Sequence, residues 1–316
     1  MNFPVFDLHC DTALALLGDD LTEAGSLRKN NCHIDLERAK VLPGYVQCFA
    51  CFTTPFMTQW HKKDPTVIFE KEIETVMREM YYNSDLISQI HSVSDIEKNR
   101  KEGKMSAILT IEGTAGFGFN PALLENLYQI GFRITTLGWN EQNPLCGSHK
   151  TGGGLTDLGR EYVKEAQRLG MIIDVSHISD EAFWDIMEIT EKPVIASHSN
   201  SRSICPVSRN LTDDMFRAIC RSGGVAGFNM CAPFVGEDPD LDTCAEHFIH
   251  FLELGGEKHI ALGGDLDGCD VLPRGFDGVQ DYPKLADKLL ERGLSEAQVY
   301  DIFWNNAMEV MRRCCT

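Results

Sequence analysis

The stretch Pro4-Val5-Phe6-Asp7-Leu8-His9-Cys10-Asp11 sets the pattern of this chain, because an apolar run ends in residues that can bind a metal or move a proton. A short apolar run bounded by polar residues predicts a buried strand of a parallel sheet. Four further runs end in the same way: 106–111 before Glu112, 171–176 before His177, 193–197 before His198 and 259–264 before Asp265. In a β/α barrel, the carboxyl ends of the strands meet at one face. We therefore expect these ends to line one pocket.

The order of the predicted elements favours a closed barrel. Apolar strands are expected near residues 4–9, 45–52, 106–111, 132–138, 171–176, 193–197, 224–229 and 259–264. Helical segments separate them, and this alternation indicates a parallel sheet. No glycine-rich phosphate loop follows the first strand, which disfavours a nucleotide-binding sheet. We predict an α/β fold, a (β/α)8 TIM-type barrel that forms a single domain over residues 1–316.

Two helical segments are predicted in more detail. Residues 64–101 show a charged exposed face and are expected to be helical. Ser295-Glu296-Ala297-Gln298 has the pattern of a capping box, in which Ser and Gln side chains bind the first free backbone N–H groups of a helix. A further helix is therefore expected to begin after Ser295, with Val299, Ile302, Phe303 and Val310 on its apolar face.

Charge and composition exclude several classes of partner. The 316 residues include 29 Lys and Arg against 47 Asp and Glu, which gives a net charge of −18. Such a chain repels nucleic acid and anionic lipid. No run approaches the roughly 18 apolar residues of a membrane span, and no signal peptide is recognised. We expect a cytoplasmic protein with no membrane or nucleic-acid partner.

The cysteines are predicted to stay reduced in that compartment. Cys48 and Cys51 have CxxC spacing, but they lie in an apolar stretch that is expected to be a strand. Positions three apart on a strand face opposite sides. We therefore interpret both as buried thiols and not as a metal-binding pair.

The polar residues at the strand ends suit a metal site when they are taken together. His9 and Asp11 are two apart, so both can face one pocket. Imidazole and carboxylate are ligands that zinc accepts. A single His177 or His198 would be read as a hydrogen-bonded core residue. Jointly, these residues supply enough ligands for two metals, with the carboxylate of Glu112 between them.

With these residues in place, the chain resembles the membrane dipeptidase (renal dipeptidase) family of the amidohydrolase superfamily, and in particular a soluble microbial-type member. The resemblance covers about residues 5 to 312. The matching motifs are Asp7-Leu8-His9-Cys10-Asp11, Ile111-Glu112-Gly113, Asp174-Val175-Ser176-His177, Pro193-Val194-Ile195-Ala196-Ser197-His198-Ser199, Ser208-Arg209-Asn210, Gly263-Gly264-Asp265-Leu266-Asp267-Gly268 and Asp281-Tyr282-Pro283.

The resemblance implies a zinc-dependent dipeptidase with two Zn²⁺ ions. His9, Asp11 and Glu112 would hold one ion, and Glu112, His177 and His198 would hold the other. A hydroxide bridging the ions would attack the peptide bond of a dipeptide. Glu112 is thus expected to serve catalysis as well as metal binding. The family also suggests a homodimer.

The resemblance further implies residues that handle the substrate. Asp265 would take the proton from the nucleophile and pass it to the leaving amine. Arg209 would bind the C-terminal carboxylate of the dipeptide, because its planar guanidinium matches a carboxylate. One position departs from the family's renal members, which carry a His after the fourth strand where this chain has Trp139. Tryptophan offers one donor and no acceptor, so Asn140 or His149 is considered as a replacement. Trp139 and Asn140 are predicted to contact substrate.

Other functions remain open at this point. A related amidohydrolase would act on another small amide or lactam, such as an N-acyl amino acid or a β-lactam. A metal-dependent deoxyribonuclease is disfavoured by the net charge and by His9-Cys10-Asp11, since those enzymes favour HxH. A non-catalytic barrel is disfavoured because all the expected ligands are present, along with Asp265 and Arg209. The sequence does not separate side-chain or D/L preferences.

Overall fold

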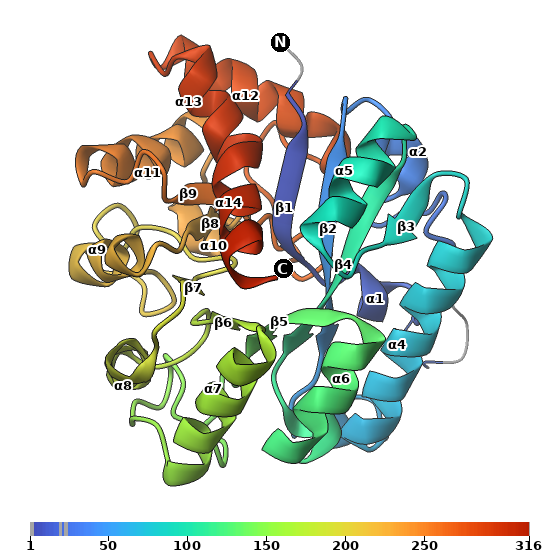
Figure 1. Cartoon of the computed structure of the whole chain (residues 1–316). Coiled ribbons are helices and arrows are strands. Elements are labelled where there is room, and N and C mark those ends of the chain that lie inside the picture. The colour runs from blue at the N-terminus through green and yellow to red at the C-terminus, as the bar shows by residue number, and fades with distance from the viewer. Residues whose placement is uncertain (1–2, 19–20, 22–24, 316) are drawn as a thin grey trace.

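The computed structural model describes residues 3–18, 21 and 25–315 and is built around a parallel sheet surrounded by helices (Figure 1). The strands are β1 (Val5–Cys10), β2 (Tyr45–Phe52), β3 (Ile87–Gln89), β4 (Met105–Glu112), β5 (Phe132–Thr136), β6 (Ile172–Asp174), β7 (Val194–Ile195), β8 (Ala226–Phe228) and β9 (Ile260–Leu262). Their order is β7-β6-β5-β4-β2-β1-β9-β8, and β3 pairs with β4 off this path. The path closes where Ala196 pairs with Ala226. The predicted TIM-type barrel is confirmed, and each expected strand segment contains an observed strand.

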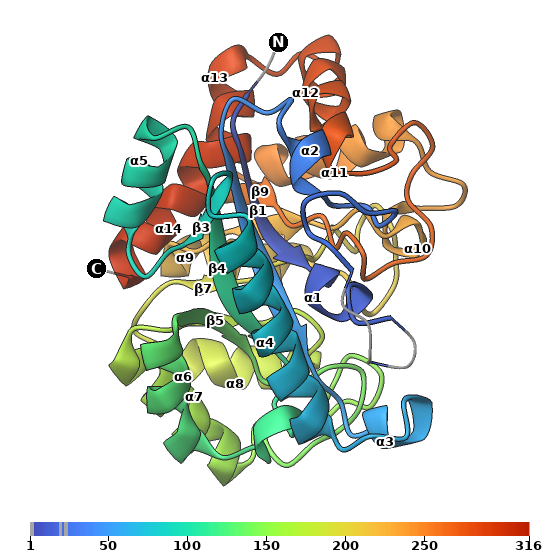
Figure 2. The ribbon, with the colours of Figure 1, turned by 90° about the vertical axis from the view of Figure 1, so that its right-hand side faces the viewer.

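Helices form the outer layer of the barrel (Figures 1 and 2). They are α1 (Thr12–Ala15), α2 (Leu36–Ala39), α3 (Met57–Trp60), α4 (Pro65–Tyr82), α5 (Val93–Lys101), α6 (Leu124–Ile130), α7 (Asp157–Leu169), α8 (Asp180–Ile189), α9 (Asp213–Ser222), α10 (Ala232–Val235), α11 (Leu241–Glu253), α12 (Tyr282–Glu291), α13 (Glu296–Tyr300) and α14 (Asn306–Cys314). Short 3₁₀ turns are η1 (Ala115–Phe117), η2 (Pro121–Leu123) and η3 (Val279–Asp281), and η4 (Asp301–Asn305) is a π turn. Among the described helices, none has both the length and the apolar character that a bilayer span requires.

Strand β4 shows how the sequence divides its side chains between two layers. Met105 and Ala107 pack in the apolar layer between the strands and the helices. Ile108 packs in a second apolar cluster inside the barrel. Because side chains alternate along a strand, Glu112, the last residue of β4, lies on the same inner side as Ile108. The same strand therefore contributes an apolar residue to the core and a carboxylate to the pocket.

Strand β1 carries an irregularity just before its polar end. It pairs Asp7 with Gln47 but Cys10 with Phe49, so β1 has one more residue than β2 between these pairs. A bulge of this kind re-aims the side chains that follow it. Cys10 packs in the outer apolar layer, while His9 turns toward the pocket. Cys10 thus faces away from the pocket that His9 enters, as the alternation of side chains along a strand requires.

Helix α14 closes the other end of the barrel. Its buried residues Met308 and Met311 join the inner apolar cluster, together with Trp304 from the preceding turn. The ring of Trp304 lies edge-on to Phe6 at 6.2 Å between centroids. Figure 2 shows α14 on the opposite side of the sheet from α1 and α10. This apolar closure leaves the carboxyl end of the barrel as the face for a polar site.

Two predictions about helices have different outcomes. The prediction that residues 64–101 are helical throughout is wrong, because β3 separates α4 from α5 and pairs with Met105–Ala107 of β4. A three-residue strand is too short to show an alternating pattern, so the helical signal on both sides dominated. The capping box at Ser295 is confirmed, since its side chain accepts the N–H of Gln298 at the start of α13.

Candidate metal centre

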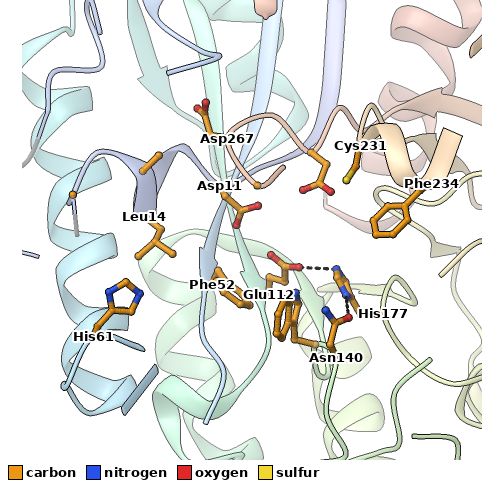
Figure 3. Close-up of a pocket in the computed structure, with 15 residues that line it drawn as sticks. Asp11, Leu14, Phe52, His61, Glu112, Asn140, His177, Cys231, Phe234 and Asp267 are labelled. Carbon is orange, nitrogen blue, oxygen red and sulfur yellow. Dashed lines mark hydrogen bonds and ion pairs between the residues drawn. The ribbon is translucent and has the colours of Figure 1, made fainter. Parts of the chain in front are cut away.

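The carboxyl ends of four strands bring the five predicted metal ligands together. His9 and Asp11 lie at the end of β1, and Glu112 is the last residue of β4. His177 and His198 follow β6 and β7. All five side chains are buried. Figure 3 shows Asp11, Glu112 and His177 facing one space, with Asn140 behind His177.

Glu112 lies between imidazoles, and its two oxygens face different ones. Oε2 is 3.2 Å from Nε2 of His9. Oε1 is 2.9 Å from Nε2 of His177 and 3.7 Å from Nε2 of His198. A carboxylate that presents one oxygen to each of two ligand groups has the arrangement of a bridging ligand.

Two of these side chains carry buried polar atoms that find no hydrogen-bond partner in the described part of the chain: Nε2 of His9 and Oδ1 of Asp11. Burying an unpaired polar atom costs free energy unless a cation or another partner satisfies it. Two groups of ligand atoms each lie within 4.8 Å of one another, His9 with Glu112 and His198, and His9 with Asp11 and Asp265. Nitrogen and oxygen donors of this type fit zinc. The residues present therefore fit a site for divalent ions.

The crowding of acids and imidazoles shifts their pKa values. Burial, and then the charge of Asp11, raises the pKa of Glu112 to about 8. Burial raises the pKa of Asp265 to about 6. Burial also lowers the pKa values of His177 and His198 well below the usual range. Both imidazoles are thus held neutral, which is the form that binds a metal.

His198 is oriented by a hydrogen-bond chain that stays within the barrel. Its Nδ1 lies 2.6 Å from Oγ of Ser197, and that hydroxyl donates to Oδ2 of Asp174 at 2.5 Å. Asp174 also accepts from Oγ1 of Thr136. A partner on Nδ1 fixes the ring and leaves Nε2 for a metal. No role of Asp174 was predicted from the sequence. Its position inside the apolar run before His177 is the signal that could have indicated this supporting role.

His177 is oriented from the loop that follows β5. Its Nδ1 lies 3.0 Å from Oδ1 of Asn140, and the same oxygen lies 2.8 Å from Nε2 of His149. Burial lowers the pKa of His149 to about 4. Asn140 lines the pocket, as expected of a substrate contact, but its carbonyl oxygen is already engaged by two histidines. His149 has no local sequence pattern that would assign it this position.

Backbone strain is concentrated at the same strand ends. His177 has φ 71° and Asp265 has φ 54°, both in the left-handed region. Such conformations cost about 1–3 kcal/mol in non-glycine residues and cluster at functional sites. Gly268 permits the approach of two carboxylates, because a Cβ there would lie 2.1 Å from Oδ2 of Asp11 and 2.4 Å from Oδ1 of Asp265.

Asp265 faces the pocket from the end of β9. Its Oδ2 accepts a hydrogen bond from Nδ2 of Asn229 at 2.9 Å. Its Oδ1 lies 3.9 Å from Nε2 of His9. Asn229 thereby holds one carboxylate oxygen and leaves the other beside His9.

Arg209 is buried beside this group, with 4% of its surface exposed. Its Nη1 donates to Oγ of Ser199 at 2.6 Å. Its Nε and Nη2 have no hydrogen-bond partner among the described residues. The guanidinium lies 5.8 Å from the ring centroid of Phe234, which lines the pocket. Two unpaired donors on one edge of a buried guanidinium are suited to a carboxylate.

The pocket has a volume of about 380 Å³ and an apolar side opposite Phe234. Phe52 and Leu14 form part of this side (Figure 3). Trp139 lies there too, with its ring centroid 5.2 Å from that of Phe52. The ring of Trp60 meets Trp139 edge-on at 5.6 Å. The structure therefore places Trp139 in the pocket wall and packs it against other aromatic rings.

Comparisons with known proteins find relatives that match most of this chain. Residues 1–315 match the profile of a family described as membrane dipeptidase (peptidase family M19). A protein of the pqqA 5′ region of Klebsiella pneumoniae is 32% identical over 79% of this chain and 97% of its own length. An uncharacterized dipeptidase of Schizosaccharomyces pombe is 32% identical over 77% of this chain and 61% of its own length.

A solved structure shows the same fold at lower identity. It is a metallopeptidase of Rhodobacter sphaeroides liganded with a phosphinate mimic of the dipeptide L-Ala-D-Ala. Its TM-score is 0.87 at 22% identity, and the match covers 99% of this chain and 100% of that one.

Proposed function

The chain belongs to the membrane dipeptidase family, peptidase family M19, and on this basis we propose that it hydrolyses dipeptides with two zinc ions at the carboxyl end of its barrel. The family assigns the coarser activity, that of a metal-dependent dipeptidase. The number of ions, their identity and the roles of the individual residues are our proposal. The geometry of the strand ends supports it.

The two ions would be held on either side of Glu112. His9 and Asp11 complete one ligand set, and His177 and His198 complete the other. This division is the one that the family resemblance implies, and it is supported by the two oxygens of Glu112, which lie 3.2 Å from His9 and 2.9 Å from His177. When bound, the ions would supply a hydroxide nucleophile at neutral pH and would polarise the scissile carbonyl.

Asp265 would move the proton. It lies beside His9 and is held by Asn229, so one oxygen stays directed at the pocket. A carboxylate there can take a proton from the nucleophile and return it to the leaving amine. The substrate amide carries no charge of its own at this bond, so both transfers are needed to release the products.

The observation that carries the proposal is the buried edge of Arg209. Nε and Nη2 lie side by side on a guanidinium, and together they match the two oxygens of one carboxylate. In Arg209 these two donors are the ones without a partner in the described residues. A dipeptide has a free carboxylate one residue from its scissile bond, so binding at Arg209 would hold the carbonyl over the metal centre.

Trp139 would contact the other half of the dipeptide. With the carboxylate at Arg209, the N-terminal residue extends toward the apolar wall formed by Leu14, Phe52 and Trp139. A Trp ring offers a large apolar surface to a side chain. The Rhodobacter protein is liganded with a phosphinate mimic of L-Ala-D-Ala. For this reason we choose a dipeptide with a D residue as the first substrate to test.

The test compares a dipeptide with its C-terminal amide. The wild type should cleave the dipeptide and act poorly on the amide, because the amide lacks the charge that Arg209 binds. A charge-assisted hydrogen bond contributes about 1.5–3 kcal/mol, which corresponds to roughly tenfold to more than a hundredfold in kcat/KM. Arg209→Ala should lose this preference and keep its metals. Arg209→Lys should lose much of the activity, because an ammonium cannot make the bidentate contact.

Arg217→Ala serves as the matched control. Arg217 is on α9, where its guanidinium lies 3.1 Å from the carboxylate of Asp214. Neither residue lines the pocket, so kcat/KM should stay at the wild-type value. Equal cleavage of dipeptide and amide by the wild type would contradict carboxylate recognition. It would favour another small amide or lactam as the substrate.

A further inference from the structure

A chain of side chains connects His177 to the loop that carries Arg209. Asn140 contacts His177 and His149 through one oxygen, at 3.0 Å and 2.8 Å. Nδ1 of His149 then lies 2.9 Å from Oγ of Ser208, the residue before Arg209. The backbone N–H of His149 also donates to the carbonyl oxygen of His177 at 2.8 Å. Residues far apart in sequence are thereby fixed to one another around the metal centre.

The direction of every hydrogen bond in this chain follows from metal binding at His177. A ring that gives the lone pair of Nε2 to a metal must carry its proton on Nδ1. Nδ1–H therefore donates, and the atom of Asn140 that it meets must be the carbonyl oxygen. Because that oxygen has no proton, His149 also donates to it from Nε2. Nδ1 of His149 then accepts the hydroxyl proton of Ser208.

His177 differs in this respect from His198. The supporting partners of His198 are Ser197 and Asp174, which lie on or next to the strands of the barrel. The supporting partners of His177, Asn140 and His149, are both on the loop after β5, and His149 in turn contacts Ser208 on the loop after β7. His198 is also connected to Arg209, through the hydroxyls of Ser197, Ser176 and Ser199. The path from His177 differs because it runs through side chains of the loop after β5.

We propose that Asn140 and His149 are positioning residues, which hold the ring of His177 toward its metal and link it through Ser208 to the loop of Arg209. This inference rests on the proposed function, because it takes His177 to be a metal ligand. It assigns Asn140 a structural task at the metal centre, with its two oxygen lone pairs already used. The side-chain NH₂ of Asn140 remains available to a substrate.

Zinc affinity tests the role of Asn140. Purified protein is stripped of metal and titrated with zinc against a chelating dye, for the wild type, Asn140→Leu, Asn140→Asp and Gln142→Leu. Asn140→Leu keeps the size but removes the acceptor, so zinc binding at one site should weaken by about 10- to 100-fold, the range found for outer-shell partners. Asn140→Asp keeps an acceptor for both histidines and should bind zinc like the wild type. Gln142 is exposed in the same loop, and its exchange should change nothing.

The outcomes distinguish the positioning role of Asn140 from the proposed function on which it rests. A wild type that takes up no zinc contradicts the proposed function, and the positioning role fails with it. A wild type that binds zinc, with Asn140→Leu equally tight, overturns the positioning role alone. Rescue by Asn140→Asp distinguishes a lost acceptor from a misfolded loop, since both exchanges alter the same position.

His149 is tested with a pair of its own. His149→Phe keeps a ring but removes both hydrogen bonds, and His149→Gln keeps an N–H donor for Asn140. Zinc affinity should fall in His149→Phe and recover in His149→Gln. Ser208→Ala removes only the last link, so it should raise the KM for a dipeptide and leave zinc affinity unchanged. Wild-type zinc affinity in His149→Phe, or wild-type KM in Ser208→Ala, would remove that residue from the chain.

Discussion

The two ends of this barrel are built by the same strands and obey opposite rules. At the amino end, Ile108 and its neighbours meet α14 in a buried apolar cluster. At the carboxyl end, the same strand ends in Glu112, whose pKa burial raises to about 8. Only three residues lie between these side chains along β4. One end stabilises the fold by burying apolar surface, and the other buries acids and imidazoles at a cost in free energy.

The difference between the two ends indicates that the functional residues lie at the carboxyl end of the barrel. Buried ionisable groups persist where hydrogen bonds, a cation or a substrate offset their desolvation. The strained backbone at His177 and Asp265 lies at the same end. Substitutions at the carboxyl end should therefore change chemistry with little loss of stability, and substitutions at the amino end should do the reverse.

The largest expected effect is that of Glu112→Gln. Gln has one carbonyl oxygen and no charge, so it cannot serve both ligand sets. Both metals should be weakened, and activity should fall to the level of the metal-free protein. Metal analysis after dialysis and a dipeptide assay check this. Retention of both metals at wild-type affinity would contradict the bridging role.

Asp265→Asn should have the next largest effect. It keeps the shape of the side chain but removes the base, so kcat should fall by at least roughly 10²-fold, the scale of general acid–base catalysis. Both metals should be retained. Near wild-type kcat would leave Asp265 with a structural role, whereas loss of metal would make it chiefly a ligand.

Ile108→Val tests the amino end on the same strand as Glu112. Removing one buried methyl group should lower the free energy of unfolding by about 0.5–1.5 kcal/mol, with metal content and kcat unchanged. Denaturant unfolding measures the loss. Cys48→Ala is a companion variant, because Cys48 lies in the same inner cluster and should also leave metal content unchanged. A drop in metal content in either variant would show that the two ends are coupled.

The metal-free protein should depend on pH through Glu112. Its pKa is raised from 4.5 to about 8 in the folded state, so the folded protein binds more protons than the unfolded chain between these values. Stability from this group is present at low pH and is lost as pH rises through about 8. Relative to Glu112→Gln, the metal-free wild type should thus lose stability as the pH rises from 4.5 to about 8, with no further change above that value.

Thermal unfolding of both metal-free proteins across that pH range measures the difference. Using the difference between the two proteins cancels the histidines with lowered pKa values, which act in the opposite direction below their usual range. Parallel curves would show that Glu112 is not protonated in the folded metal-free protein.

The sequence predicted the barrel and the strand ends because both depend on local patterns. Apolar runs of a few residues marked the strands, and His9, Glu112 and Asp265 stood at their ends. The short strand β3 was missed because three residues, Ile87–Gln89, do not make a period. His149 was considered only as a replacement for the family's His and not as a partner of Asn140. It reaches Asn140 through an irregular loop, where no repeating pattern tells which side chains meet.

The proposed function requires that Glu112 separates two metal ions at the carboxyl end of the barrel. Anomalous scattering from a crystal of the zinc-loaded protein, recorded at the zinc absorption edge, tests this most directly. We predict two peaks, one between Glu112 and the pair His9 and Asp11, the other between Glu112 and the pair His177 and His198. A single peak, or peaks away from Glu112, would contradict the claim.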